Sequence, residues 1–130
     1  MARKKILVVD DDPEVRLALE LRLKANGYTV ALAEDGEKSI VQTRLHMPDL
    51  ILLDLGLPAK DGFSVMESLK SDKSMASIPV IILTGRDRAS NLDRAFKAGI
   101  DAFLQKPVQN SRLLAVISQG LTQGRAYVRD

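Results

Sequence analysis

The chain contains no cysteine and no tryptophan, and its single histidine is His46. Without cysteine there is no disulfide, no thiol nucleophile and no thiolate-bound metal cluster, and one histidine excludes a metal site built from several imidazoles. The apolar run behind the basic N-terminus extends only from Ile6 to Val9. This run is far shorter than a signal-peptide core or a membrane span of about 20 residues. We therefore expect a cytoplasmic protein that does not associate with a membrane.

A large excess of one charge is also missing. Lys and Arg number 19 and Asp and Glu number 17, and the basic residues are spread along the chain. Aromatic residues, which would stack on bases, make up only 4% of the sequence. We do not expect this domain by itself to bind nucleic acid directly.

The length and composition indicate one globular domain. The chain has 130 residues, of which 45% are hydrophobic and 28% are charged, and a chain of this length does not divide into two stable cores. Apolar periodicity extends to about residue 122. We predict a single domain over residues 1–122, followed over residues 123–130 by a C-terminal tail or the start of a linker.

The hydrophobic pattern predicts alternating strands and helices. Three runs, Ile6–Val9, Leu50–Leu53 and Val80–Leu83, are continuously apolar, which is typical of parallel strands buried on both faces. Thr29–Ala33 and Ala102–Gln105 are weaker strand candidates. Apolar residues recur at the four-residue spacing of a helix at Val15, Leu19 and Leu23 and again at Leu113, Ile117 and Leu121. The pattern predicts an α/β fold with five parallel strands and five helices.

The first helix has recognisable boundary residues. Asp12 can accept hydrogen bonds from its first free amides, and Pro13 suits its first position. Asn26 and Gly27 suit the left-handed turn at its end. We therefore interpret Asp12 as a helix cap and not as a metal ligand.

Polar side chains follow four of the five strands. Asp10 and Asp11 follow the first, Asp54 the third, Thr84 the fourth and Lys106 the fifth. Right-handed crossovers place the carboxyl ends of parallel strands at one edge of the sheet, where ligands bind. We therefore expect three carboxylates, a hydroxyl and an ammonium group to lie close together.

Such a cluster of carboxylates requires a cation. Two carboxylates 4 Å apart repel by about 4 kcal/mol at an effective dielectric constant near 20. The cation can be Lys106 or a divalent metal, and an all-oxygen set suits Mg²⁺ better than zinc. A phosphoryl group would complete the site, with oxygens bound by Mg²⁺, by Lys106 and by the Thr84 hydroxyl. Asp54, at the end of the central strand, can itself accept the phosphoryl group as an acyl phosphate.

Four motifs occur in order at ordinary spacings. They are Ile6-Leu7-Val8-Val9-Asp10-Asp11-Asp12-Pro13, then Leu50-Ile51-Leu52-Leu53-Asp54-Leu55-Gly56-Leu57-Pro58 with Asp61-Gly62, then Ile82-Leu83-Thr84, and finally Ala98-Gly99-Ile100-Asp101-Ala102-Phe103-Leu104-Gln105-Lys106-Pro107. Together they resemble the receiver domain of bacterial two-component response regulators, over about residues 5–121. The resemblance implies a flavodoxin-like, doubly wound sheet with strand order 2-1-3-4-5, and a cis bond between Lys106 and Pro107.

The resemblance also implies roles for individual residues. Asp54 would be the phosphoacceptor of a signalling domain whose only chemistry is its own Mg²⁺-dependent phosphorylation and dephosphorylation. Thr84 and Lys106 would contact the phosphoryl group, and Phe103 would be the switch aromatic that follows Thr84. The metal ligands implied are the carboxylates of Asp10, Asp11 and Asp54 and the carbonyl of Gly56.

The resemblance implies one partner that donates the phosphoryl group and another that receives the signal. The phosphoryl group would come from a sensor histidine kinase or a histidine phosphotransfer protein. The signal would leave through the fourth helix, the fifth strand and the fifth helix, whose exposed side chains we expect to include Lys97 and Arg112. The output would be a partner protein or a missing effector domain, and the resemblance also allows a homodimer through the same face.

Two departures from the family pattern and three rival functions remain. Gly85 follows Thr84 where the family commonly has alanine, and Phe103 lacks the hydroxyl of the commoner tyrosine.

The rival functions differ from a receiver domain in the residues they require. A nucleotide-binding domain would have a glycine-rich loop after the first strand, where this chain is acidic. A dehalogenase-like hydrolase would use Asp10 as nucleophile and Asp12 as a second acid, but Pro13 follows directly. The third rival is a receiver-like interaction module that is never phosphorylated.

Overall fold

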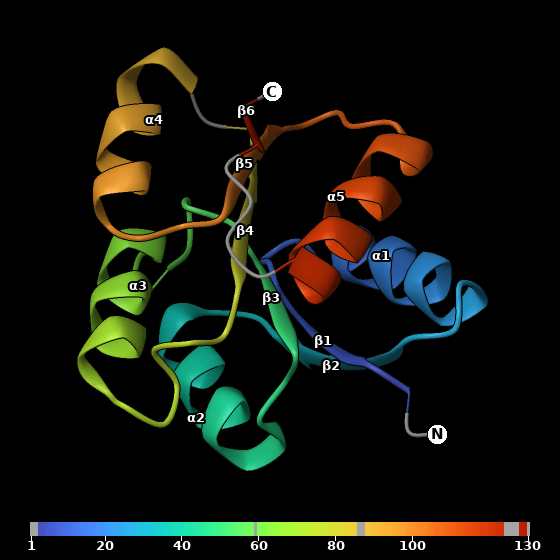
Figure 1. Ribbon diagram of the computed structural model, residues 1–130, viewed down its shortest axis with the longest axis horizontal. Coiled ribbons are helices and arrows are strands. Elements are labelled where there is room, and N and C mark those ends of the chain that lie inside the picture. Colours follow the sequence, from blue (N-terminus) through green and yellow to red (C-terminus); the bar gives the residue numbers. More distant parts are fainter. Residues whose placement is uncertain (1–2, 59, 86–87, 124–127, 130) are drawn as a thin grey trace.

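The computed structural model describes residues 3–58, 60–85, 88–123 and 128–129. Strands and helices alternate along the chain (Figure 1) in the order β1 (Lys5–Val9), α1 (Pro13–Ala25), β2 (Thr29–Ala33), α2 (Gly36–His46), β3 (Leu50–Leu53), α3 (Gly62–Ser71), β4 (Val80–Thr84), α4 (Arg88–Lys97), β5 (Ala102–Gln105), α5 (Asn110–Gln123) and β6 (Val128–Arg129). None of the helices in the described ranges is long and apolar enough to cross a membrane.

The strands form one parallel sheet. The five predicted strands have the order β2-β1-β3-β4-β5, as predicted, and β6 adds to the free edge of β5. β6 lies in the expected tail. A strand of two residues is too short to produce a hydrophobic pattern, so the sequence contains no signal for it. Residues 124–127 and 130 of the expected tail lie outside the described residues.

Helices cover both faces of the sheet. α1 and α5 lie on one side of it, and α2, α3 and α4 lie on the other (Figure 1). Alternate strand residues supply two separate cores. Ile6 and Val8 pack with buried residues of α1 and α5, whereas Leu7 and Val9 pack with those of α3 and α4. The continuous apolar runs therefore reflect burial on both faces, as the pattern predicts.

The ends of the helices follow from local side chains. The Asp12 carboxylate accepts hydrogen bonds from the amides of Glu14 and Val15, with Pro13 in the first turn, so the predicted cap is confirmed. Gly27 adopts a φ of 90° just after α1, the left-handed conformation that glycine tolerates best. The peptide bond between Lys106 and Pro107 is cis.

Candidate functional site

Backbone hydrogen bonds beyond the strands hold the strand ends in line. The Asp10 amide donates to Ala33 O at 3.2 Å, and the Asp54 amide donates to Val9 O at 3.0 Å. Between the ends of β5 and β4, the Lys106 amide donates to Thr84 O at 2.8 Å. The first residue after β1, β3 and β5 is thus held by a neighbouring strand, at the carboxyl edge of the sheet.

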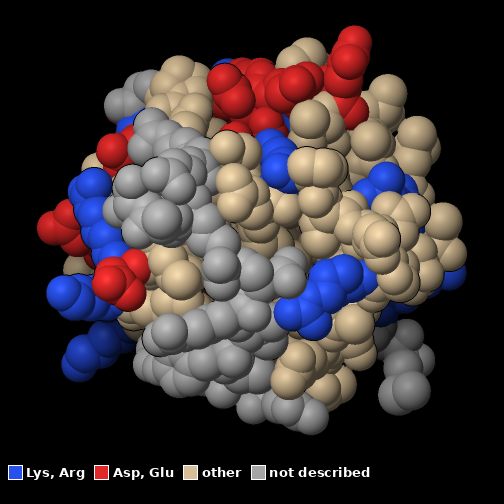
Figure 2. All heavy atoms as spheres, turned by 90° about the horizontal axis from the view of Figure 1, so that it is seen from above, with Lys and Arg blue, Asp and Glu red and all other residues tan. Residues whose placement is uncertain are grey.

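Three carboxylates meet at this edge. Carboxylate oxygens of Asp10, Asp11 and Asp54 all lie within 4.8 Å of one another. Asp10 is buried, with 3% of its surface exposed, whereas Asp11 is exposed and Asp54 is partly buried. Asp12 is outside this group, because its carboxylate caps α1. Figure 2 shows a face of the molecule on which several acidic side chains gather in a patch at the upper edge, while other acidic side chains alternate with basic ones at the left.

Lys106 lies between two of these carboxylates. Its Nζ donates to Asp10 Oδ2 at 2.6 Å and lies 3.6 Å from Asp54 Oδ2. Burial lowers the pKa of Lys106, but its hydrogen bond to Asp10 and the negative charges of Asp54 and Asp10 outweigh burial and hold the pKa above its ordinary value. The ammonium group is therefore charged at neutral pH and offsets part of the carboxylate repulsion.

The other oxygen of Asp54 accepts hydrogen bonds. The Thr84 hydroxyl donates to Asp54 Oδ1 at 2.7 Å, and the Gly56 amide donates to the same oxygen at 3.2 Å. Thr84 is completely buried at the end of β4. Thr84, at the end of β4, and Lys106, just after β5, thus approach the two different carboxylate oxygens of Asp54. The proposed role of the Gly56 carbonyl as a metal ligand stays a prediction.

The donor chemistry of the cluster fits a hard cation. The clustered groups are all carboxylates, and they supply oxygen atoms, which Mg²⁺ prefers. Zinc favours nitrogen and sulfur ligands, but the chain has no cysteine and its one histidine lies at the end of α2. The residues present therefore fit Mg²⁺.

Three residues expected to take part in signal output lie away from this edge. Phe103 is fully buried in β5, on the face of the sheet covered by α3 and α4, and its register partner on β4 is Ile82. Lys97 is exposed at the end of α4, as predicted. Arg112 is only partly exposed and has a contact within the protein, so its prediction as an exposed side chain is wrong. It lies one residue before the fully buried Leu113, and an arginine stem packs readily along apolar surface.

Arg16 approaches the site without having been predicted. Its Nη1 donates to the backbone carbonyl of Asp10 at 2.6 Å. Arg16 lies four residues after Asp12, in the first turns of α1, and its amide donates to Asp12 O. An arginine in a helix is ordinary by itself, and a contact with a backbone carbonyl produces no motif, so the sequence contains no specific signal for it.

Comparison with known proteins identifies the family. The sequence profile of the response regulator receiver domain matches residues 6–118. The transcriptional regulator RpaA of Synechocystis is 39% identical over 111 residues, covering 85% of this chain and 46% of RpaA. The response regulator PleD of Caulobacter vibrioides is 39% identical over 127 residues, covering 97% of this chain and 28% of PleD. The chain thus spans less than half of the length of either relative.

Solved structures give the same result. A CheY-like receiver domain protein from Methanospirillum hungatei has a TM-score of 0.88 at 28% identity, covering 94% of this chain and 96% of its own. The receiver domain of a sensor histidine kinase from Pseudomonas aeruginosa has a TM-score of 0.85 at 28% identity, covering 92% of this chain and 98% of its own. That structure has a magnesium ion coordinated in its active-site cleft. With its fold, its acidic strand ends and a profile match over most of its length, the chain belongs to the response regulator receiver domain family of two-component signalling proteins.

Proposed function

We propose that this receiver domain accepts a phosphoryl group on the Asp54 carboxylate in a Mg²⁺-dependent reaction. The observation that carries the proposal is the environment of Asp54. Its carboxylate has a cation 3.6 Å from one oxygen and a hydroxyl 2.7 Å from the other, and it lies beside two further carboxylates. We expect a sensor histidine kinase or a histidine phosphotransfer protein to be the donor.

In this reaction a carboxylate oxygen of Asp54 forms a bond to phosphorus while the phosphorus–nitrogen bond of the donor's phosphohistidine breaks. The released imidazole nitrogen keeps the bonding electrons and takes up a proton. Lys106 offsets the negative charge that accumulates between Asp54 and the transferred group. Mg²⁺, when bound through Asp10, Asp11 and Asp54, supplies further neutralisation of the phosphoryl oxygens.

The proposed output uses Thr84 and Phe103. Phosphorylation replaces the single carboxylate charge of Asp54 by a phosphoryl group that carries between one and two negative charges and strong acceptor oxygens. The Thr84 hydroxyl, which donates to Asp54 Oδ1, is the donor placed to follow the new charge. Movement of Thr84 would alter the packing between β4, Phe103 and α4. We propose α4, β5 and α5 as the face that an output protein, an effector domain or a second copy of the chain would read.

Replacement of the acceptor tests this function. Asp54→Asn preserves the size of the side chain and removes the nucleophile, so incubation with Mg²⁺ and acetyl phosphate should no longer add a phosphate to the intact mass. Asp12→Asn is the matched control, because it removes an equal charge from a residue that caps α1 and should still be labelled. Undiminished labelling of Asp54→Asn would disprove the assignment.

A further inference from the structure

Asp10 is held at each of its polar atoms. Its amide donates to Ala33 O. Oδ1 accepts from the Asp12 amide at 3.0 Å and Oδ2 accepts from Lys106 Nζ at 2.6 Å. The remaining polar atom is the carbonyl oxygen, and Arg16 Nη1 donates to it at 2.6 Å. Arg16 therefore completes the hydrogen bonds of Asp10, whose exposed fraction is only 3%.

Asp11 is constrained quite differently. It is exposed, and among the described residues no hydrogen bond to its carboxylate is present. The position of this carboxylate thus depends on its own backbone. The Asp10 carbonyl belongs to the peptide group that joins Asp10 to Asp11, so the hydrogen bond from Arg16 fixes the orientation of that peptide group and of the residue after it.

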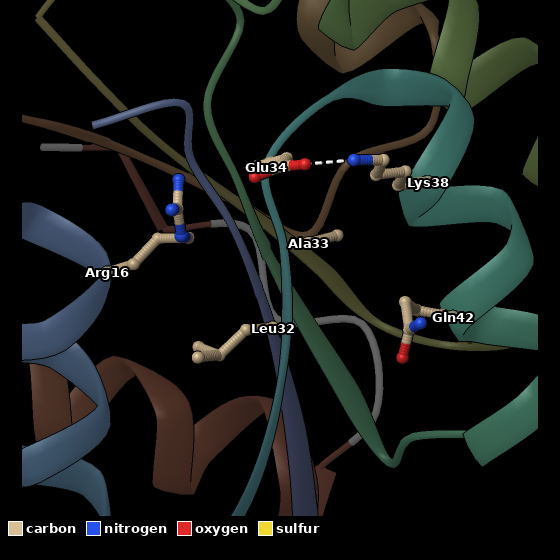
Figure 3. Close-up of a pocket in the computed structure, with 6 residues that line it drawn as sticks. All are labelled: Arg16, Leu32, Ala33, Glu34, Lys38 and Gln42. Atoms are coloured by element: carbon tan, nitrogen blue, oxygen red, sulfur yellow. Dashed lines mark hydrogen bonds and ion pairs between the residues drawn. The ribbon is translucent and has the colours of Figure 1, made fainter. Parts of the chain in front are cut away.

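The surroundings of Arg16 keep it available for this contact. Arg16 extends from α1 on one side of an open pocket of about 280 Å³, and Glu34 and Lys38 form an ion pair across it (Figure 3). The hydrogen bond and the charge of Lys38 lower the pKa of Glu34, with a smaller contribution from Arg16. Glu34 thus has Lys38 as its direct partner, and the guanidinium group of Arg16 donates to the Asp10 carbonyl.

We propose that Arg16 is a positioning residue of the acidic site, which orients the Asp10–Asp11 peptide group so that the Asp11 carboxylate is presented for Mg²⁺ binding. This inference rests on the proposed Mg²⁺-dependent function. Arg16 acts through the backbone, because its guanidinium group donates to the Asp10 carbonyl.

Charge and geometry lead to opposite expectations for Arg16, which makes the proposal testable. If the guanidinium group acted only through its positive charge, its removal would strengthen Mg²⁺ binding, since like charges repel. If it positions Asp11, its removal weakens Mg²⁺ binding. Loss of a hydrogen bond that orients a metal ligand typically weakens metal binding by roughly 10-fold or more.

The experiment measures Mg²⁺ affinity by isothermal titration calorimetry with magnesium chloride alone on the full chain. Arg16→Met should weaken binding roughly 10-fold, and Arg16→Lys should weaken it less, because an ammonium group can still donate one hydrogen bond. Lys24→Met is the matched control. Lys24 lies on the same helix, carries the same charge and pairs at the surface with Glu20, so its loss should leave the affinity unchanged.

A second measurement separates positioning from a general loss of structure. At saturating Mg²⁺, labelling of Arg16→Met by acetyl phosphate should return to nearly the parent rate, because the variant retains Asp54 and Lys106. In the metal-free protein, the amide resonances of Asp11 and Asp12 should shift in Arg16→Met and not in Lys24→Met. If Arg16→Met fails to fold, Arg16→Leu carries the same test, because leucine also suits a helix and also lacks a hydrogen-bond donor.

Parent-like or tighter Mg²⁺ binding by folded Arg16→Met, or by Arg16→Leu where only that variant folds, would overturn the proposal. Asp11→Ala, titrated in parallel, distinguishes this failure from failure of the proposed function. If Asp11→Ala binds Mg²⁺ as well as the parent, the metal site itself is wrong. If Asp11→Ala loses Mg²⁺ and the Arg16 variants do not, only the role of Arg16 is wrong.

Discussion

Two glycines near Asp54 differ in the space around them. A Cβ atom on Gly62 would lie 2.8 Å from Leu55 Cα and 2.9 Å from Asp54 O. The Gly62 amide also donates to Leu55 O at 3.2 Å. The N-terminus of α3 therefore packs directly on the backbone that carries the proposed acceptor. A Cβ atom on Gly85, at the end of β4, would have no atom within 4 Å.

Alanine at these two positions should have opposite consequences. Gly62→Ala must displace backbone and should lower the free energy of unfolding by about 1–3 kcal/mol, and it should slow labelling because Asp54 moves. Gly85→Ala places the family's commoner residue in open space. It should leave stability unchanged or raise it by about 0.4–1 kcal/mol, since alanine restricts the unfolded chain.

Urea unfolding of the two variants and the parent measures both effects. Each variant adds the same methyl group beside the same site, so each is a control for the other. A Gly62→Ala variant as stable as the parent would show that α3 can move away from Asp54 at little cost.

Most residues at the sheet edge could be predicted, because each follows a strand that is recognisable from sequence. Asp10, Asp54 and Lys106 are examples, and the ladder of backbone hydrogen bonds explains why they meet. Arg16 and Arg112 could not be predicted. Their positions depend on where long, flexible side chains settle against the folded backbone, and neighbouring residues in the sequence do not determine that.

At the scale of elements, two adjacent acids at the N-terminus of α1 have different contacts. The Asp12 carboxylate accepts hydrogen bonds from two free amides of the helix, at 2.9 Å and 3.4 Å. The Asp11 carboxylate instead points to the acidic cluster, where its charge is repelled by Asp10 and Asp54. Removal of the Asp12 carboxylate therefore removes a helix cap, whereas removal of the Asp11 carboxylate relieves its repulsion by Asp10 and Asp54.

We predict opposite changes in metal-free stability. Asp12→Ala should lower the free energy of unfolding by about 1 kcal/mol, the usual cost of losing a helix cap. Asp11→Ala should leave it equal or raised. Asp12→Asn is a further control, because asparagine caps helices as well as aspartate does. Thermal unfolding followed by circular dichroism, in the presence of a chelator, measures all three. A loss of stability in Asp11→Ala equal to that in Asp12→Ala would refute the division of roles.

The elements themselves were predictable to different degrees. The predicted strand Thr29–Ala33 matches β2, and Val80–Leu83 is one residue shorter than β4. In α1 the prediction of the buried face is correct for Leu19 and Leu23. The same helix carries Leu17 and Leu21 at an equal spacing, yet they are 55% and 61% exposed. Periodicity identifies a helix with two apolar rows, but only packing against the sheet decides which row is buried.

At the scale of the molecule, the proposed path from Thr84 through Phe103 to α4 lies on the face of the sheet opposite α1. Phe103 belongs to the core formed with α3 and α4, which includes the fully buried Ala95 of α4. Thr84 already donates to Asp54 Oδ1 while Phe103 is fully buried. The inward packing of Phe103 is therefore compatible with the unphosphorylated carboxylate, and the phosphoryl group has to strengthen an existing contact rather than create one.

This arrangement predicts where phosphorylation changes the protein. With Mg²⁺ and beryllofluoride, which mimics the phosphoryl group, amide hydrogen exchange should slow in β4, β5 and α4 and remain nearly unchanged in the middle of α1. The Thr84 hydroxyl already donates to a charged acceptor, and such a bond contributes roughly 1.5–3 kcal/mol, so strengthening it adds at most about 1.5 kcal/mol. Since 1.4 kcal/mol corresponds to a factor of ten, exchange of the slowest affected amides should change by up to about 10-fold. Thr84→Val retains the shape of the side chain without its hydroxyl and should abolish the change in α4, whereas Thr84→Ser retains the hydroxyl and should preserve it. Equal changes of hydrogen exchange in α4 of Thr84→Val and Thr84→Ser would mean that the signal reaches α4 without the Thr84 hydroxyl. The path through β4 and Phe103 would then be wrong, and a path through the loop after Asp54 would have to replace it.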